Sequence, residues 1–209
     1  MKAPIVDGQC NTFAGEYFGR RIGATANLAF AIGRRDDSQF VFVCISVTSD
    51  TTNNPFLDWG LLLFDTLHDG GLGPQPDDRL FFVYNRDAFV YWFMGDGVGG
   101  WVDCTFVCDM GDAAAGAFVG TRVIYEFGIR YTDVWGSLTP PGSSVAGFGI
   151  YVHDDGLQID YWWGNLFVNP SDPETWGHLE LPEFEAPIAA TAVAGLVLWL
   201  RRRRRTGSG

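Results

Sequence analysis

The stretch Gln39–Thr48 reads QFVFVCISVT, and it predicts the fold class of the chain. β-Branched and aromatic residues fill it, and these residues suit the half-buried surface of a strand. Similar apolar runs recur along the chain, separated by Gly, Asp, Asn and Pro. The same pattern predicts strands at Ala24–Ile32, Trp59–Asp65, Arg79–Asn85, Ala88–Phe93, Trp101–Cys108, Arg122–Ile129 and Gly147–His153.

Turn signals connect these strands, and helical patterns are nearly absent before residue 182. Asn85-Arg86-Asp87 predicts a tight turn that makes a hairpin of its flanking strands. One short helical turn is expected at Asp133–Ser137. About eight strands in roughly 180 residues predict an all-β, antiparallel β-sandwich over residues 1–181.

The C-terminal residues 182–209 have the layout of a membrane anchor or sorting tail. A short motif, Pro182, Glu183 and Phe184, precedes a mostly apolar segment at 185–200 that predicts one transmembrane helix. Five arginines then follow, a stop signal that the positive-inside rule places in the cytoplasm. They are Arg201, Arg202, Arg203, Arg204 and Arg205. The sandwich is therefore expected to be an extracellular domain anchored in the cell membrane.

This ordered tail resembles the PEF-CTERM sorting tails of archaeal surface proteins. The resemblance covers residues 182–205 and implies that an archaeosortase-like membrane enzyme recognises and processes the tail. An ordinary single-pass anchor, or a buried C-terminal helix of a soluble domain, is the alternative. The expected signal peptide is not visible in Met1–Gly8, which lacks an apolar core.

Net charge and cysteine content bear on the class of ligand and on the cellular compartment. Residues 1–182 carry nine basic against 23 acidic residues, a net charge of −14, which argues against nucleic-acid binding. Four cysteines, Cys10, Cys44, Cys104 and Cys108, permit two disulfides outside a cell. Three connectivities are open. Cys104 and Cys108 lie about 13 Å apart on an extended strand, so these two are not expected to pair with each other unless that strand bends, and Cys44 with Cys104 or Cys108 is the pairing that the sequence suggests.

Several short segments follow one another in a characteristic order along the chain. They are Val6-Asp7-Gly8, Asn54–Trp59, Leu63–Gly71, Pro76-Asp77-Asp78, Tyr125–Ile129, Gly147–Asp154 and Trp176–Leu181, and the most specific part is Leu63–Asp78. In this order they resemble family-9 carbohydrate-binding modules and their DOMON-like relatives. The resemblance covers roughly residues 5–181 and implies a β-sandwich that binds sugars, often with structural calcium.

Acidic residues around one loop form a candidate cation site. Asp65, Asp69, Asp77 and Asp78, with Asp58 nearby, follow one strand and precede the next. Hard oxygen ligands on a glycine-containing loop suit Ca²⁺, which takes six to eight oxygens. The alternative is that these carboxylates cap turns and stay solvated.

Tryptophans beside loops are the candidate sugar contacts, because pyranose C–H faces stack on indole rings. Family-9 modules hold a terminal sugar between two tryptophans, and the resemblance makes Trp162 and Trp163 the first candidates and Trp101 the next. Adjacent strand residues face opposite sides, so we expect only one of Trp162 and Trp163 to point outward.

Catalytic patterns are weak in this sequence. No G-x-S-x-G is present, and His68, His153 and His178 lack the spacing of a zinc site. Asp154-Asp155 has the composition of a turn rather than the arrangement of a glycosidase carboxylate pair. Some DOMON relatives bind haem through Met and His, and the resemblance implies only Met94 with His153 as such a pair. The sequence predicts a non-enzymatic, glycan-binding surface protein. A structural envelope protein of the same fold without a small ligand is the alternative.

Overall fold

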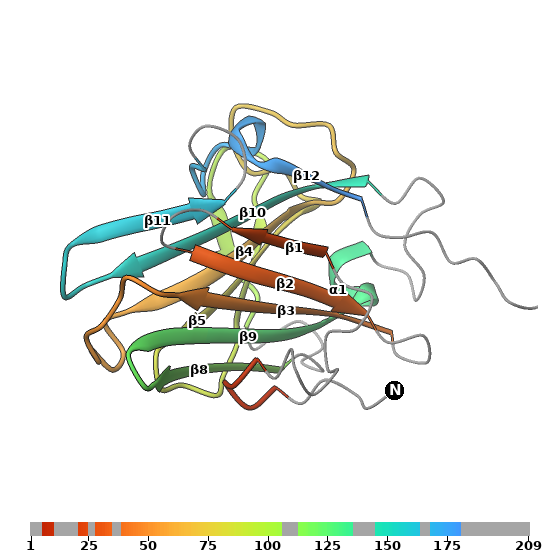
Figure 1. Ribbon diagram of the computed structural model, residues 1–209. Coiled ribbons are helices and arrows are strands. Elements are labelled where there is room, and N and C mark those ends of the chain that lie inside the picture. The colour runs from red at the N-terminus through yellow and green to blue at the C-terminus, as the bar shows by residue number, and fades with distance from the viewer. Residues whose placement is uncertain are drawn as a thin grey trace, which may run out of the picture.

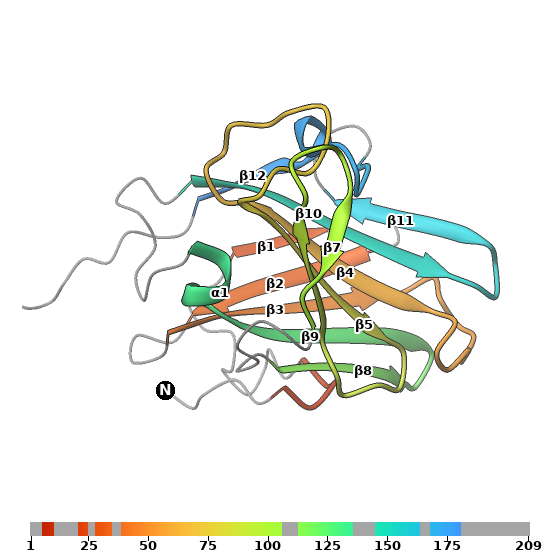
Figure 2. The ribbon, with the colours of Figure 1, turned by 180° about the vertical axis from the view of Figure 1, so that it is seen from behind.

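The computed structural model describes residues 6–10, 21–24, 28–34, 39–105, 113–135, 145–163 and 168–180, and every structural statement below concerns these residues. Two antiparallel sheets pack face to face, one seen from the front in Figure 1 and the other in Figure 2. The predicted all-β antiparallel sandwich is therefore confirmed.

The five-stranded sheet has the order β1-β2-β3-β9-β8. Its strands are β1 (Arg21–Ala24), β2 (Leu28–Arg34), β3 (Phe40–Val47), β8 (Ala113–Val119) and β9 (Arg122–Arg130). The predicted strand Ala24–Ile32 is in fact two antiparallel strands, in register from Arg21↔Ile32 to Ala24↔Ala29. The small residues of β8 gave no strand signal, yet β8 pairs with β9 along its whole length.

The seven-stranded sheet has the order β11-β10-β4-β5-β6-β7, with β12 also paired to β10. Its strands are β4 (Trp59–Asp65), β5 (Asp78–Tyr84), β6 (Tyr91–Gly95), β7 (Trp101–Asp103), β10 (Val145–Asp154), β11 (Ile159–Trp163) and β12 (Gly177–Glu180). The helix α1 (Tyr131–Trp135) follows β9, and a 3-10 turn, η2 (Pro173–Thr175), precedes β12. The strand predicted at Trp101–Cys108 ends at Asp103.

Alternate residues of both sheets fill the space between them. Val43 and Ile45 of β3, Phe127 of β9 and Leu62 and Phe64 of β4 are fully buried there. No helix in the described part of the chain is both long and apolar enough to cross a bilayer. The tail motif, the apolar segment 185–200 and Arg201–Arg205 lie outside that part, so the anchor stays a prediction.

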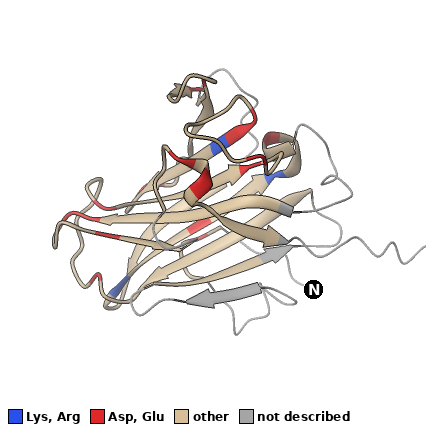
Figure 3. Ribbon diagram, turned by 90° about the horizontal axis from the view of Figure 1, so that it is seen from above, with Lys and Arg blue, Asp and Glu red and all other residues tan. Residues whose placement is uncertain are grey.

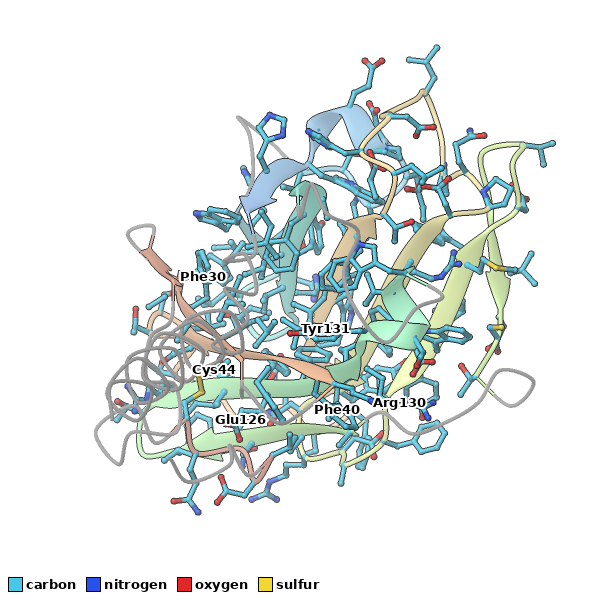
Figure 4. All side chains as sticks on the ribbon, turned by 90° about the vertical axis from the view of Figure 1, so that its right-hand side faces the viewer. Phe30, Phe40, Cys44, Glu126, Arg130 and Tyr131 are labelled. Atoms are coloured by element: carbon cyan, nitrogen blue, oxygen red, sulfur yellow. A yellow bond between two sulfur atoms is a disulfide. The ribbon has the colours of Figure 1, made fainter. Side chains whose placement is uncertain are left out.

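A disulfide joins Cys10 to Cys44, so the predicted pairing of Cys44 with Cys104 or Cys108 is wrong. The Cys44 side chain points away from the core, onto the outer face of the five-stranded sheet, where Val6 and Cys10 pack. Cys104 follows β7 at the far edge of the other sheet and forms a separate disulfide. Figure 4 labels Cys44 and Glu126 on adjacent strands.

Candidate aromatic face and acidic clusters

The seven-stranded sheet carries aromatic side chains on its outer face as well as on its inner face. Residues that alternate with the core positions Leu62, Phe81 and Val152 point outward. Most of them are half-buried rather than covered. We call the following set the aromatic face: Trp59 of β4, Phe82 and Tyr84 of β5, Tyr91 of β6, Tyr151 of β10 and Trp162 of β11.

Trp59 lies at the centre of this face. Its ring stacks beside Tyr151 at a centroid distance of 5.6 Å and beside His153 at 5.3 Å, with interplanar angles of 19° and 23°. Phe82 lies 5.5 Å away on the other side. The strand register explains the arrangement, because Trp59 is directly opposite His153 on β10 and Tyr84 on β5. Rings on adjacent strands therefore stand side by side across the sheet.

Carboxylates border the aromatic face at two places. Asp160 of β11 lies 2.7 Å from Nδ1 of His153, and it accepts a hydrogen bond from the Tyr151 hydroxyl. Burial and this bond raise the pKa of Tyr151 well above its usual value. Near β6, burial and the charge of Asp87, which accepts a bond from the Tyr91 hydroxyl, raise the pKa of Tyr91. The face thus combines apolar ring surface with fixed hydrogen-bonding groups.

The predicted tryptophans do not form one site. Trp163 points inward, 4.5 Å from Phe30 between the sheets, whereas Trp162 points outward. The rings of Trp101 and Trp176 are nearly parallel, with their centroids 6.4 Å apart, but Trp176 is only 2% exposed. No pair of exposed parallel indoles at a sugar's width is present among the described residues.

The loop acids come together in part. Oxygens of Asp65, Asp69 and Asp77 lie within 4.8 Å of one another. Asp65 and Asp77 also hold the loop in place. Asp65 accepts a hydrogen bond from the Gly70 amide at 2.9 Å, and Asp77 accepts one from the Leu67 amide at 3.1 Å. Asp78 lies opposite Asp65 in the strand register but is fully buried, and its carboxylate accepts from the Gln75 amide at 2.7 Å. Burial raises its pKa to about 7.

Asp58 belongs to a different cluster, at the opposite end of β4 from Asp65. There it meets Asp50 and Asp154, and all three residues are fully buried. Many acidic residues of the molecule lie in loops or at strand ends, as Figure 3 shows. The expectation that Asp58 lies near the Asp65 loop is wrong, because a seven-residue strand separates them.

Met94 and His153 cannot bind one haem iron together. Met94 alternates with Phe93, which points outward, so Met94 points to the inner side of the sheet. His153 points outward beside Trp59. His68 and His178 do meet, with Nε2 of His68 2.8 Å from Nδ1 of His178 on the molecular surface.

No family model matches this sequence. No curated protein matches it either. Among solved structures, the chain is similar to a family-9 carbohydrate-binding module from Caldicellulosiruptor kristjanssonii in complex with cellotriose, with a TM-score of 0.59 and 16% identity over 88% of this chain and 93% of that chain. A family-9 module from the same organism in complex with glucose gives a TM-score of 0.55 and 15% identity over 88% and 94%.

The protein has the fold of a family-9 carbohydrate-binding module. This confirms the part of the predicted resemblance that concerns the sandwich. At 15–16% identity the likeness shows the fold alone, since one fold hosts many functions. The function therefore has to be argued from the aromatic face and the acidic clusters.

Proposed function

We propose that the protein is a non-catalytic glycan-binding protein whose ligand lies on the aromatic face. The observation that carries the proposal is the stacked row around Trp59, which is partly exposed and bordered by Asp160 and Asp87. Pyranose rings have apolar C–H surfaces that pack on aromatic side chains, and their hydroxyls need polar partners nearby. Both kinds of group occur together on this face.

The ring spacing indicates how a sugar would lie. A pyranose held between two aromatic planes needs two van der Waals separations, about 7–8 Å in all. Trp59 stands only 5.3 Å from His153 and 5.6 Å from Tyr151, so no sugar fits between these rings. The glycan would instead lie across the row, with its hydroxyls directed to Asp160 at one side. This replaces the sandwich between tryptophans that the family resemblance implies.

The spacing of the carboxylates supports binding without hydrolysis. Glycosidases need two carboxylates about 5–9.5 Å apart. Asp160 is on β11 and Asp87 follows β5, three strands away in the sheet order. Three strand spacings amount to roughly 14 Å, which is too far for one glycosidic bond.

Surface display is the second part of the proposal. Its support is the sequence of residues 182–205, a short motif, an apolar segment and an arginine cluster. The disulfide between Cys10 and Cys44 supports it as well, because disulfides persist in oxidising compartments. In this role the protein would hold polysaccharide at the cell membrane, and an archaeosortase-like enzyme would process the tail.

A glycan array with the full chain tests the binding proposal. We expect wild type to bind a set of neutral glycans and Trp59→Ala to lose that binding. Phe40→Ala is the matched control, because Phe40 is a half-buried aromatic on the outer face of the other sheet, labelled in Figure 4. The proposal fails if wild type binds no glycan, or if Trp59→Ala binds as wild type does.

A further inference from the structure

Two of the three histidines of the chain meet on the molecular surface, although their sequence spacing is not that of a zinc site. His68 lies in the β4–β5 connection and His178 lies on β12, 110 residues further along the chain. Nε2 of His68 is 2.8 Å from Nδ1 of His178, and the rings meet edge to face with their centroids 4.5 Å apart. The β4–β5 connection and β12 both lie at the upper end of the molecule in Figure 1.

The strand register explains why these two side chains meet. His178 is directly opposite Gly147 of β10, and Gly147 is directly opposite Asp65 of β4. Residues opposite one another share a face of the sheet, so His178 and Asp65 stand on the same face on either side of Gly147. Gly147 has no side chain to separate them, and a Cβ there would lie only 2.7 Å from the Cβ of Asp65. The chain leaves β4 at Asp65 and, three residues later, places His68 against His178.

Hydrogen bonds on both sides of His68 hold it in position. The Leu67 amide donates to Oδ2 of Asp77 at 3.1 Å, and the Asp69 amide donates to Oδ1 of Asp65 at 3.3 Å. Between these two bonds His68 has a left-handed backbone conformation with a φ of 55°, which residues other than glycine adopt uncommonly. A ring that the backbone already holds in place loses little freedom when it binds a ligand, and this favours affinity.

The contact between the two ring nitrogens is one that a metal ion can replace. In a neutral pair, one imidazole N–H donates to the lone pair of the other ring. If the donor ring carries its proton on its other nitrogen instead, both contact nitrogens direct lone pairs toward one point, and no proton is lost overall. Zinc binds imidazole nitrogen at about 2.0–2.1 Å, and two such bonds at roughly 90–109° put the nitrogens about 2.9–3.4 Å apart. The observed 2.8 Å is close to this range.

Carboxylates near the pair favour a cation there. The cluster of Asp65, Asp69 and Asp77 belongs to the end of β4 and to the connection that carries His68. Among the described residues, no carboxylate oxygen lies within 4.8 Å of both imidazoles, so these acids act through their charge and not as ligands. Clustered charges of one sign raise the local concentration of ions of the other sign, and they stabilise a bound dication.

We propose that His68 and His178 bind one Zn²⁺ ion, with water in its remaining coordination positions. Imidazole nitrogen suits zinc, copper and nickel, whereas calcium takes oxygen ligands, so the chemistry of this site differs from that of either acidic cluster. Closed structural zinc sites use four protein ligands. With two protein ligands, this site binds zinc reversibly and leaves positions open for a further ligand.

The ion joins the last described strand to the body of the sheet. Among the described strands, β12 pairs with β10 alone, from Val145↔Glu180 to Phe148↔Gly177. A zinc ion on His178 adds a link from β12 to the β4–β5 connection, just before the predicted tail that begins at Pro182. The site lies at the opposite end of β4 from Trp59, about 20 Å along the strand. Zinc binding is therefore independent of the proposed glycan site.

Calorimetric titration with ZnCl₂ tests the site on the full chain, prepared without a polyhistidine tag. We expect wild type to bind Zn²⁺ at one site, and His68→Asn and His178→Gln each to weaken that binding. Even partners of the ligands contribute about 10–100-fold to metal affinity, so the loss of a direct ligand should cost at least about tenfold. Asparagine is chosen at residue 68 because it tolerates a left-handed backbone.

Three control variants locate the ion. His153→Gln removes the third histidine, which contacts Asp160 instead, and it should bind Zn²⁺ as wild type does. Asp69→Asn and Asp77→Asn should weaken Zn²⁺ binding less than either His68→Asn or His178→Gln, because these acids are not ligands. All five variants should melt in EDTA near the wild-type temperature, since the two ligand histidines are exposed and their hydrogen bond competes with water.

Electron paramagnetic resonance with Cu²⁺ in place of Zn²⁺ counts the nitrogen ligands. Wild type and His153→Gln should show hyperfine coupling to two imidazole nitrogens, and His68→Asn and His178→Gln should show coupling to one or none. The proposal is overturned if wild type shows no saturable Zn²⁺ binding, or if His68→Asn and His178→Gln bind it as wild type does. It is also overturned if an aspartate variant or His153→Gln loses binding while those two variants keep it.

Discussion

Gly60→Ala should destabilise the sandwich, because the ring of Tyr125 lies against the Gly60 backbone. A Cβ atom at residue 60 would stand 2.8 Å from both Cγ and Cδ2 of Tyr125. Carbon atoms pack at about 3.5–4.0 Å, so the ring or the strand must move by roughly 1 Å. Tyr125 is fully buried between the sheets and has little room to yield. Overpacking of this kind costs about 1–3 kcal/mol.

The alanine also recovers some free energy, since glycine inside a strand costs about 0.5–1 kcal/mol relative to alanine. The net loss should be about 1–2 kcal/mol, a fall in melting temperature of roughly 2–8 °C for a chain of this length. Circular dichroism during heating measures it. Gly149→Ala is the control, because its Cβ would stand no nearer than 3.1 Å to any atom, the nearest being methyl carbons of Leu63 and Val168. An unchanged or raised melting temperature for Gly60→Ala would refute the packing argument.

Two further perturbations follow from the buried acids and the disulfide. Burial raises the folded-state pKa of Asp50 to about 6 and that of Asp78 to about 7, above the ordinary 3.8. The folded state therefore holds these protons more tightly than the unfolded chain, so stability in EDTA should fall as pH rises from 5 to 8. Asp78→Asn should make this loss of stability with rising pH smaller. A melting temperature in EDTA that rises from pH 5 to pH 8 would contradict the raised pKa values of Asp50 and Asp78. Replacing Cys10 and Cys44 by serine removes a disulfide between residues 34 apart in sequence. The free energy of unfolding, measured with urea, should fall by about 3–4 kcal/mol. A fall of less than about 1 kcal/mol would show that the disulfide contributes little to stability.

The strands with dense β-branched and aromatic residues were predictable from sequence. The run WGLLLFD predicts β4 with the observed bounds, Trp59–Asp65, and QFVFVCISVT predicts β3 to within one residue at each end. β8, with the sequence AAAGAFV, lacks that signal because small residues have low strand propensity. Its position is set by the partner strand and by Gly116, where any Cβ would collide with the backbone of Tyr84.

The candidate sites were harder to predict because they depend on strand pairing. Asp50, Asp58 and Asp154 are far apart in sequence, and no local motif links them. Each does flank one end of a predicted strand, and the pairing of Trp59 with His153 brings two of those ends together. The same pairing builds the aromatic face. A correct strand order would have revealed both sites, whereas the family resemblance favoured the adjacent pair Trp162 and Trp163, whose side chains point to opposite faces.

Chemical shifts of the tryptophan indole N–H groups test the central claim most directly. ¹⁵N-labelled protein would be titrated with a glycan selected on the array, with Trp59→Phe and Trp163→Phe used to assign the peaks. We predict that the Trp59 peak moves in proportion to glycan bound, while the peak of Trp163, which lies between the sheets, stays in place. A bound glycan that leaves the Trp59 peak unmoved would contradict a binding site on the aromatic face.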